Sequence, residues 1–372
     1  MAGYIMSLDN IDALQYCIES GTYSTKMNIK NIWNKQQEGT FADYFSMKEG
    51  DNIYFFIQRK IYGIGKIVNV GFDCKYLNFI DADIARSFSA NEMRVNQQLL
   101  SGSTDSNRCF CTFKPTPYFF RRGVDMDEVL SSNPSKFRML RAMWKVSFIK
   151  VSDDENQAIV DIILKRNEEY IENGRNTFIY DDTVHDYILN HVTQSHSLGP
   201  EKILSACEEV NEKLKHEMAI EAALCYLLSN ENHPIFGSWD YISHQVIASP
   251  FKAIDYMDKM DIFGYRYIFG YKTISKYLVI EIKKDRAECE VIDQIMKYVD
   301  WIQKEYAFGD YSMIQAYIVA ADYTEEVIEK RNREGVRNFT KGYRPTNSCI
   351  WNDIKLLRYR YNGTYIDFEE IN

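Results

Sequence analysis

The chain has 372 residues, of which 45% are hydrophobic and 26% are charged, and its formal net charge is −9. Because this length exceeds what one ordinary core holds, we expect two domains. The negative charge excludes a particle that coats nucleic acid with a uniformly basic surface, so a polyanion would have to bind a local basic patch. The 27 tyrosines and 21 phenylalanines favour substantial β structure.

The spacing of the cysteines and the length of the apolar runs indicate the cellular compartment of the protein. Eight cysteines occur without the spacing of a disulfide scaffold, and Cys109 and Cys111 have no second Cys or His pair at zinc-site spacing. We therefore expect reduced thiols in a cytoplasmic protein. Residues 1–14 contain Asp9 and Asp12 and no long apolar run, so we expect no signal peptide. No stretch approaches the roughly 20 apolar residues of a membrane span.

Residues 1–165 are predicted to form a first domain of strands and short helices. A turn cluster leads into a β-rich run, and a second such run follows Arg59 and Lys60, which together indicate a hairpin. Acidic residues from Asp153 onward suit the first turn of a helix. The expected elements are hairpin strands at 53–57 and 61–68, strands at 108–113 and 145–150, and a helix over 158–164.

Residues 166–200 are predicted to be a linker with a short helix over 184–191, because loop-forming residues cluster on both sides of that helix. A second domain, residues 201–372, begins with a long helix over 201–228 that is rich in Ala, Leu, Glu and Lys. The remaining expected elements are strands at 245–247, 261–269, 277–283 and 315–320, with a helix over 287–306 between the last two.

Three charged residues of the second domain point to chemistry. Glu281 and Lys283 end an apolar strand two residues apart, so their side chains share a face. Asp261 begins the preceding strand, and its rivals Asp255 and Asp258 come before it. An isolated Glu-x-Lys is usually a surface ion pair of little worth, but a glutamate in a central strand is costly without a partner or a metal. Two carboxylates and an ammonium at one sheet edge can hold a divalent metal and a water beside a phosphodiester.

The flanking helices supply further polar groups. Glu221 lies on the helix before these strands, and Glu217, one turn earlier, is the alternative inward residue. Gln294 and Tyr298 lie four residues apart on the helix that follows, so they share a face. Carboxylates on the first helix could hold a second metal or a metal-bound water, and an amide on the second could steady the attacking water.

The ordered set Glu221, Asp261, Glu281-x-Lys283, Gln294 and Tyr298 resembles the PD-(D/E)XK nuclease superfamily over roughly residues 201–323. It is most similar to the NucS (EndoMS) type of endonuclease domain, and Shedu-type defence nucleases carry a similar core. The resemblance implies Mg²⁺ or Mn²⁺ held by Asp261 and Glu281 with Glu221, and catalytic roles for these residues together with Lys283 and Gln294. No proline precedes Asp261, and the longer segment before Glu281 predicts an extended hairpin around 269–275.

The N-terminal strands resemble PUA-like barrels of the EVE and YTH branch. The resemblance rests on Gly50-Asp51 before an aromatic strand and on a Gly-Ile-Gly run in the next strand. In that family the barrel holds a modified or flipped base in an aromatic-walled pocket, where stacking contributes about 1–3 kcal/mol per base. The wall residues that this implies are Trp33, Tyr118, Phe119 and Trp144, although aromatics at such positions are more often core.

Residues 330–360 interleave basic and aromatic side chains, a composition that suits phosphate contact together with base stacking. A solvated surface that balances acidic segments, or a surface that binds a partner protein, is the alternative. The candidate nucleic-acid-binding cations are Arg337, Lys341, Arg344, Arg358 and Arg360.

The two resemblances imply an α/β domain with a restriction-endonuclease-like mixed sheet flanked by helices, preceded by an α+β PUA-like barrel. The expected activity is metal-dependent endonucleolytic cleavage of DNA, in restriction or anti-phage defence by family analogy, with the first domain selecting the target. We expect a homo-oligomer, a dimer or higher, because duplex cutters often pair two sites by symmetry. A non-catalytic nucleic-acid sensor and an RNA-directed nuclease are the alternatives, and the sequence does not separate DNA from RNA.

Overall fold

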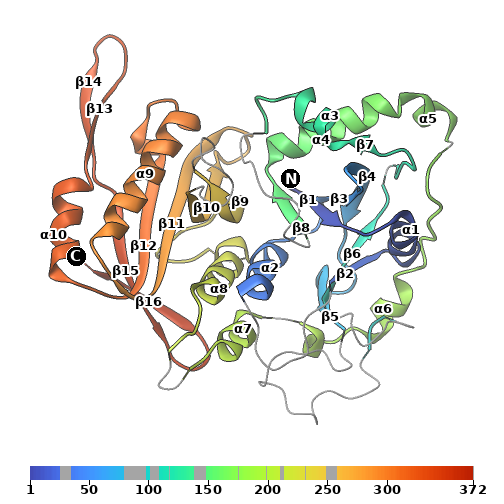
Figure 1. Ribbon diagram of the computed structural model, residues 1–372, viewed down its shortest axis with the longest axis horizontal. Coiled ribbons are helices and arrows are strands. Elements are labelled where there is room, and N and C mark those ends of the chain that lie inside the picture. The colour runs from blue at the N-terminus through green and yellow to red at the C-terminus, as the bar shows by residue number, and fades with distance from the viewer. Residues whose placement is uncertain are drawn as a thin grey trace. The chain divides into compact units, whose positions relative to one another are not determined.

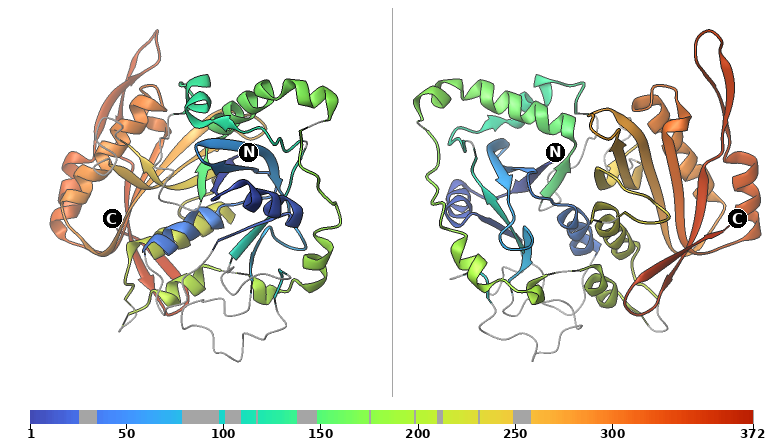
Figure 2. Two further views of the ribbon diagram at one scale, coloured as in Figure 1. Left: turned by 45° about the vertical axis from the view of Figure 1, so that its right-hand side comes forward. Right: turned by 180° about the vertical axis from the view of Figure 1, so that it is seen from behind.

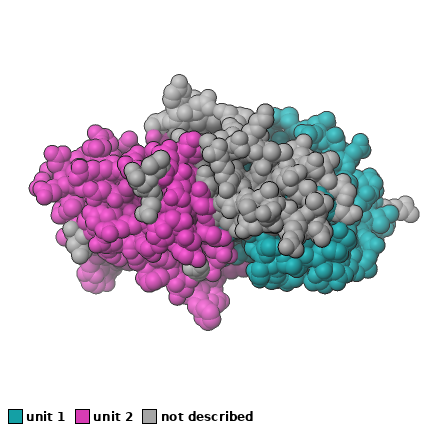
Figure 3. Space-filling view, turned by 90° about the horizontal axis from the view of Figure 1, so that it is seen from below, with its two compact units in different colours: residues 1–199 teal, residues 200–372 magenta. Residues whose placement is uncertain are grey.

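The structure, a computed structural model, describes residues 1–25, 35–78, 98–100, 109–116, 118–137, 148–174, 176–197, 199–209, 213–230, 232–248 and 258–371. The chain divides into two compact units, residues 1–199 and residues 200–372 (Figure 3). All eight cysteines are free, as expected. Within the part of the chain that is described, no helix has the length and apolar character needed to cross a membrane.

Unit 1 contains a curled sheet with helices around it (Figure 1). Its strands are β1 (Gly3–Ser7), β2 (Thr22–Thr25), β3 (Asn52–Ile57), β4 (Lys60–Ile67), β5 (Lys75–Leu77), β6 (Cys109–Lys114), β7 (Val124–Asp125) and β8 (Phe148–Val151). Its helices are α1 (Ile11–Ser20), α2 (Lys35–Phe45), α3 (Met126–Ser132), α4 (Asp153–Arg166), α5 (Glu168–Asn173), α6 (Asp186–His191) and the 3₁₀ turn η2 (Gln194–His196). The sheet order is β2-β6-β4-β3-β1-β8, with β5 on β6 and β7 on β4.

The β3–β4 hairpin of unit 1 confirms the predicted pair of strands. Its two turn residues, Gln58 and Arg59, have φ angles of 45° and 67°, the left-handed conformation that matches the twist of the flanking strands. The helix predicted near Asp153 is also confirmed, because Ser152 and Glu155 form a capping box at the start of α4.

A buried polar network fastens α4 to the unit 1 sheet. The Asn52 amide donates to the Tyr54 hydroxyl over 3.1 Å, and that hydroxyl donates to Asn156 Oδ1 over 2.7 Å. Ile5, Ile61 and residues on the buried face of α4 pack around Tyr54 as an apolar cluster. These hydrogen bonds fix the orientation of α4 on the sheet, because breaking them would leave the Tyr54 hydroxyl and the Asn156 amide oxygen buried without partners.

Unit 2 is a mixed sheet flanked by helices (Figure 1). Its helices are α7 (Pro200–Ala206), α8 (Glu217–Asn230), α9 (Glu290–Glu305), α10 (Glu325–Glu334) and the 3₁₀ turn η4 (Tyr311–Met313). Its strands are β9 (Tyr241–Ile247), β10 (Lys259–Tyr267), β11 (Ile274–Ala287), β12 (Ile314–Tyr323), β13 (Arg337–Lys341), β14 (Asn347–Trp351), β15 (Ile354–Tyr361) and β16 (Ile366–Ile371). Six of these strands follow the order β16-β15-β12-β11-β10-β9, and β13 and β14 form a separate ribbon.

Strand β11 lies inside the unit 2 sheet, antiparallel to β10 and parallel to β12. Its residues 277–282 are all buried, as expected for a strand covered on both faces. The apolar stripe of α9, which includes Ile292, Ile295 and Val299, is buried, and α9 packs on β11 and β12. The expected α/β class, with a mixed sheet flanked by helices and a barrel-like N-terminal sheet, is therefore confirmed.

The predicted long helix over 201–228 is wrong, because α7 ends at Ala206, α8 begins at Glu217, and the described residues between them, 207–209 and 213–216, are not helical. The backbone N–H of Lys215 donates to the Cys207 carbonyl over 2.8 Å, and Glu208 and Leu214 form an isolated β-bridge. These hydrogen bonds reverse the chain where local propensity alone favours a continuous helix. The expected strand at 245–247 begins earlier, at Tyr241.

Gly264 gives a stability test for the β9–β10–β11 strands. A Cβ atom at this position would lie 2.6 Å from Ile242 Cδ1 and 2.7 Å from the Tyr241 carbonyl oxygen, and a backbone atom cannot move aside easily. We expect Gly264→Ala to lower the free energy of unfolding by about 1–3 kcal/mol, measured by chemical denaturation. Thr273→Ala, an exposed position in the turn between β10 and β11, serves as the control, and equal stabilities for both variants would contradict this packing.

Candidate active site

Two neighbouring strands bring the predicted acidic residues together. Ile262 pairs with Ile280 in the antiparallel β10–β11 ladder. Asp261, one residue before Ile262, therefore lies next to Glu281, one residue after Ile280. Asp261 Oδ2 accepts a hydrogen bond of 2.8 Å from the backbone N–H of Ile282. The carboxylate of one strand is thus fixed against the backbone of the next, directly beside the Glu281–Lys283 pair.

Glu281 is the most deeply buried of these residues. Its side chain is only 1% exposed, and its Oε1 accepts a hydrogen bond of 2.6 Å from Lys283 Nζ. Its other oxygen, Oε2, is buried and has no hydrogen-bond partner among the residues that the structure describes. Since a buried charged oxygen without a partner is costly, this atom is suited to an electropositive ligand.

Glu221 and Asp261 are bridged by one amide. Gln245 Nε2 donates to Glu221 Oε2 over 3.0 Å and to Asp261 Oδ1 over 3.1 Å. Gln245 lies opposite Asp261 in the β9–β10 ladder, and its φ of 51° is in the left-handed region. This sparsely populated conformation marks a local irregularity in β9 at the position that touches both carboxylates.

The two glutamates of α8 occupy different positions. Glu221 is buried beside Gln245 and Asp261, whereas Glu217 Oε1 accepts a hydrogen bond of 3.2 Å from the backbone N–H of Lys284. The charge of Glu217 nevertheless acts on Asp261 and Glu281. Both residues therefore border the same group of carboxylates.

Burial and mutual repulsion raise the proton affinity of the carboxylates. Burial raises the pKa of Glu281 to about 8, and the charge of Asp261 adds to the increase. Burial raises the pKa of Asp261 to about 6, against hydrogen bonds from Ile282 and the charge of Lys283. The Glu221 pKa is well above its usual range because of burial and the charge of Asp261. Burial alone would lower the Lys283 pKa, but the charges of Glu281 and Asp261 outweigh it and raise that pKa.

Gln294 and Tyr298 lie on the side of α9 that is near Glu281. The Gln294 amide donates a hydrogen bond of 2.9 Å to the Tyr298 hydroxyl, so the partner of this amide is Tyr298 and not Lys283. Burial raises the pKa of Tyr298, and the charge of Glu281 adds to the increase. The two residues form a polar wall beside the carboxylates.

Sequence reasoning missed Gln245. Its position in a short, partly polar strand carried no signal that distinguishes it from other strand residues. Only the pairing of β9 with β10 brings its amide between two carboxylates from different elements.

A hard divalent cation fits this donor set. Among the described residues, no three His, Cys, Asp or Glu side chains are grouped as a ready metal cluster. Mg²⁺, however, usually keeps several waters and uses one or two carboxylates together with substrate phosphates. Asp261 and the unpartnered Oε2 of Glu281 supply two such oxygens, with Glu221 behind them. These residues could hold Mg²⁺ or Mn²⁺ without a third carboxylate in direct contact.

The aromatic residues of unit 1 that were predicted to line a base-binding pocket differ in burial and in whether the structure describes them. Trp33 and Trp144 lie outside the described residues. The Phe119 side chain is 1% exposed, and its ring contacts Phe55 and Phe178. Tyr118 is half-buried and packs against the apolar cluster around Tyr54. In the described part of the unit, the Phe119 ring is thus a core element.

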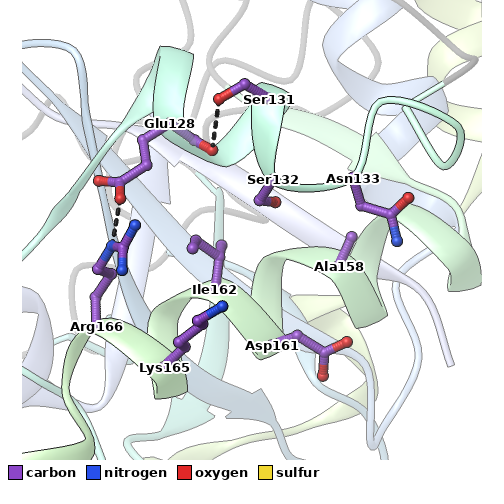
Figure 4. Close-up of a pocket in the computed structure, with 9 residues that line it drawn as sticks. All are labelled: Glu128, Ser131, Ser132, Asn133, Ala158, Asp161, Ile162, Lys165 and Arg166. Atoms are coloured by element: carbon purple, nitrogen blue, oxygen red, sulfur yellow. Dashed lines mark hydrogen bonds and ion pairs between the residues drawn. The ribbon is translucent and has the colours of Figure 1, made fainter.

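A depression of about 370 Å³ lies between α3 and α4 of unit 1 (Figure 4). Glu128 and Arg166 form an ion pair in its wall. None of its lining side chains is aromatic, so it is not the aromatic-walled pocket that the PUA-like resemblance implies. The lining residues are Glu128, Ser131, Ser132, Asn133, Ala158, Asp161, Ile162, Lys165 and Arg166.

Most of the predicted nucleic-acid-binding cations have acidic partners within unit 2. Arg337 makes two hydrogen bonds of 2.8 Å to Asp300. Arg344 stacks on Tyr343, with 5.1 Å between its guanidinium carbon and the ring centroid, and has no acidic partner among the described residues. The other pairs are Lys341 with Asp310 (2.9 Å), Arg358 with Asp322 (2.8 Å) and Arg360 with Glu369 (3.5 Å).

Comparisons with known proteins gave no family model that matches the chain and no match among curated proteins. Several solved structures are similar over part of it, among them the following three. A repair endonuclease from Pyrococcus abyssi is 24% identical, with 34% of this chain and 46% of that chain covered and a TM-score of 0.22. The chain thus spans about half of that endonuclease.

The other two likenesses are to smaller proteins. A complex of the YTH domain-containing protein mmi1 with RNA is 14% identical, with 46% of this chain and 86% of that chain covered and a TM-score of 0.26. A structural-genomics protein from Agrobacterium tumefaciens is 11% identical, with 44% and 92% covered and a TM-score of 0.25. Because these TM-scores are low, we base the function on the geometry of the site.

The buried carboxylates predict how stability depends on pH. Glu281 binds its proton more tightly in the folded protein, where its pKa is about 8, than in the unfolded chain, where it is near 4.5. The folded state therefore holds more protons between these values, and the free energy of unfolding of the metal-free protein falls as pH rises from about 4.5 to about 8. Lys283, whose pKa is raised from 10.5, contributes no change in this window.

Glu281→Gln removes the buried charge and keeps the side-chain size. At pH 8, with EDTA present, we expect this variant to melt higher than the wild type, by roughly 2–4 °C for each kcal/mol gained. At pH 5 Glu281 is already protonated in the folded protein, so the difference should shrink. Thermal melts at both pH values check this, and an equal gain at pH 5 would contradict the assigned burial.

Proposed function

We propose that unit 2 is a metal-dependent phosphodiesterase that cleaves DNA as an endonuclease. The observation that carries this proposal is the buried Glu281 Oε2, which has no hydrogen-bond partner among the described residues, while Oε1 of the same carboxylate accepts from Lys283. A purely structural ion pair would satisfy both carboxylate oxygens. Here one oxygen is satisfied by Lys283 and the other is left for a ligand.

Each residue of the site has a task in phosphodiester hydrolysis. Asp261 and Glu281 would hold Mg²⁺ or Mn²⁺, with Glu221 behind them. Such an ion would polarise the phosphate and lower the pKa of a bound water. Lys283 can orient that water and offset the charge that develops on the phosphoryl oxygens. Lys283 is 32% exposed, so its ammonium can reach a substrate that Glu281 cannot.

Gln245 and Gln294 act on the groups that perform the chemistry. The Gln245 amide fixes the orientation of the Asp261 and Glu221 carboxylates through two hydrogen bonds. Gln294, bonded to Tyr298, bounds the site on the α9 side and presents its amide oxygen for a water. Groups in this supporting position tune ligand geometry and affinity.

Target selection and biological role form the finer part of the proposal. Unit 1 would select the DNA, in line with its resemblance to PUA-like barrels, and the pair of units would serve restriction or anti-phage defence. A homodimer or higher oligomer would place two sites on the two strands of a duplex. Digestion of matched single-stranded DNA, duplex DNA and RNA, with and without modified bases, tests the substrate class directly.

Removal of the site residues should abolish cleavage without unfolding the protein. We expect Glu281→Ala and Lys283→Ala each to reduce the cleavage rate in Mg²⁺ or Mn²⁺ by about 10²–10³-fold or more, since each removes charge stabilisation at the reacting phosphate. The rate is measured on labelled plasmid and oligonucleotide substrates.

Lys284→Ala is the matched control, because Lys284 is the next residue on β11 and its ammonium pairs with Asp285. This variant should cleave at the wild-type rate. Full cleavage by a folded Glu281→Ala, Lys283→Ala double variant would remove this site from the reaction. Cleavage of RNA alone would replace DNA as the substrate.

Gln245→Ala tests the positioning of the carboxylates. Loss of the amide leaves Asp261 and Glu221 without their shared donor, and we expect metal affinity to fall about 10–100-fold. Calorimetric titration of Mn²⁺ measures this without turnover. Gln245→Glu is the companion variant, because it replaces the shared donor with a further carboxylate and so raises the repulsion at Asp261 and Glu221. Unchanged Mn²⁺ affinity in Gln245→Ala would show that the amide does not position the ligands.

A further inference from the structure

The β13–β14 ribbon is a separate two-stranded element of unit 2 that projects from its sheet (Figures 1 and 2). Arg337 pairs with Trp351, and Thr340 pairs with Ser348. An isolated hairpin is marginally stable in water. This one is fastened at its base, where the Tyr311 ring lies 5.7 Å from the Phe339 ring and 6.2 Å from the Trp351 ring.

The two faces of the ribbon differ in what they contact. Arg337, Phe339 and Lys341 alternate along β13 on the face that bonds to the rest of unit 2. Side chains on the other face are exposed along its length. Its members are Asn338, Thr340, Ser348 and Ile350, of which the first three carry hydrogen-bonding groups and none is charged.

The cation of the ribbon that has no acidic partner among the described residues, Arg344, lies at its tip. Residues 335–352 contain no Asp and no Glu, in a chain whose net charge is −9. Two of the three cations in this segment, Arg337 and Lys341, are neutralised by Asp300 and Asp310. The third, Arg344, lies in the connection between the strands beside Tyr343, which is 78% exposed.

We propose that the outward face of the β13–β14 ribbon, with Arg344 at its tip, enters a groove of duplex DNA and positions the duplex on unit 2. This inference rests on the proposed function, since it assigns part of the substrate contact of the same nuclease. The candidate DNA-contacting residues of the C-terminal region thereby change from five cations to Arg344 together with Asn338, Thr340 and Ser348.

The dimensions and the chemistry of the ribbon agree with this occupant. A strand rises about 3.3 Å per residue, so β13, from Arg337 to Lys341, extends roughly 13 Å before the connection that carries Arg344. The major groove, about 12 Å wide and 8.5 Å deep, admits a two-stranded ribbon. Asn, Ser, Thr and Arg are side chains that hydrogen-bond to base edges. The absence of carboxylates removes the repulsion that the rest of this acidic chain would present to phosphates.

A second copy of this chain is the competing occupant. Both ribbon edges expose unpaired backbone groups, which can pair with another strand. A ribbon built for self-association would be expected to gain from an apolar outward face, yet Ile350 is the sole apolar residue of the four. The charge pattern therefore favours a polyanion.

The test measures binding of a fluorescent duplex of about 30 base pairs by anisotropy, between about 50 and 200 mM salt. EDTA prevents cleavage. The variants are Arg344→Ala and the triple variant Asn338→Ala, Thr340→Ala, Ser348→Ala. Lys213→Ala is the control, because Lys213 is exposed and lies next to Leu214 of the Glu208–Leu214 bridge. This bridge is distant from the ribbon along the chain, and its Glu208 accepts a hydrogen bond from the Tyr361 hydroxyl at the end of β15.

We expect Arg344→Ala and the triple variant each to weaken duplex binding roughly 5-fold or more, while Lys213→Ala binds like the wild type. Thermal melts and Mn²⁺ titration should be unchanged in all variants, since none touches the carboxylate site. Unchanged affinity in both ribbon variants would overturn the inference. So would a changed oligomeric state with unchanged DNA affinity, measured by light scattering, which would assign the ribbon to a second copy.

The results distinguish failure of the ribbon inference from failure of the proposed nuclease function. If the wild type binds Mn²⁺ and cleaves DNA while the ribbon variants bind duplex normally, the ribbon inference alone is wrong. If the wild type neither binds duplex nor cleaves it, the proposed function and the ribbon inference are both wrong.

Discussion

The burial of Glu281 in a central strand is the constraint on which the site depends. Its carboxylate lies among apolar residues of β11, and Lys283 on the same face satisfies one oxygen. Burying an ionised group costs several kcal/mol unless it is paired and hydrogen-bonded. The neighbouring ammonium offsets part of this cost, and the second carboxylate oxygen has no partner among the described residues. Under the proposed function, a cation bound at that oxygen would offset the rest, so metal binding would stabilise the fold.

The remaining polar groups are arranged around that charge. Asp261 is held by the backbone of β11, Glu221 is held by Gln245, and Gln245 holds Asp261 in turn. The charge of Asp261 raises the pKa values of Glu221 and Glu281, so a cation bound beside these carboxylates would relieve repulsion between them. Strongly shifted pKa values of this kind cluster at functional sites.

The predicted nucleic-acid-binding cations of unit 2 differ in whether they have an acidic partner. Composition alone suggested a broad basic and aromatic surface. The structure neutralises Arg337, Lys341 and Arg358 with carboxylates from α9, the η4 turn and β12. Arg344 is left at the end of a ribbon without acidic residues. A count of basic residues therefore overstates the surface available to a polyanion.

Features that depend on residues close together in the chain could be predicted from the sequence alone. The shared face of Glu281 and Lys283, the i, i+4 placement of Gln294 and Tyr298, the β3–β4 hairpin and the start of α4 all follow from strand or helix periodicity and from turn and capping residues. Fold class followed from the same signals, because alternation and amphipathicity are visible in a single chain.

Features that depend on contacts between distant segments could be found only in the folded structure. The role of Gln245 arises only when β9 lies against β10, the break between α7 and α8 comes from hydrogen bonds that reverse the chain, and the neutralised state of Arg337 requires α9. Local propensity contains no information about which strand will be the neighbour or which carboxylate will face a given cation. Periodicity fixes the direction of a side chain, and only the assembled sheet and helices supply its partner.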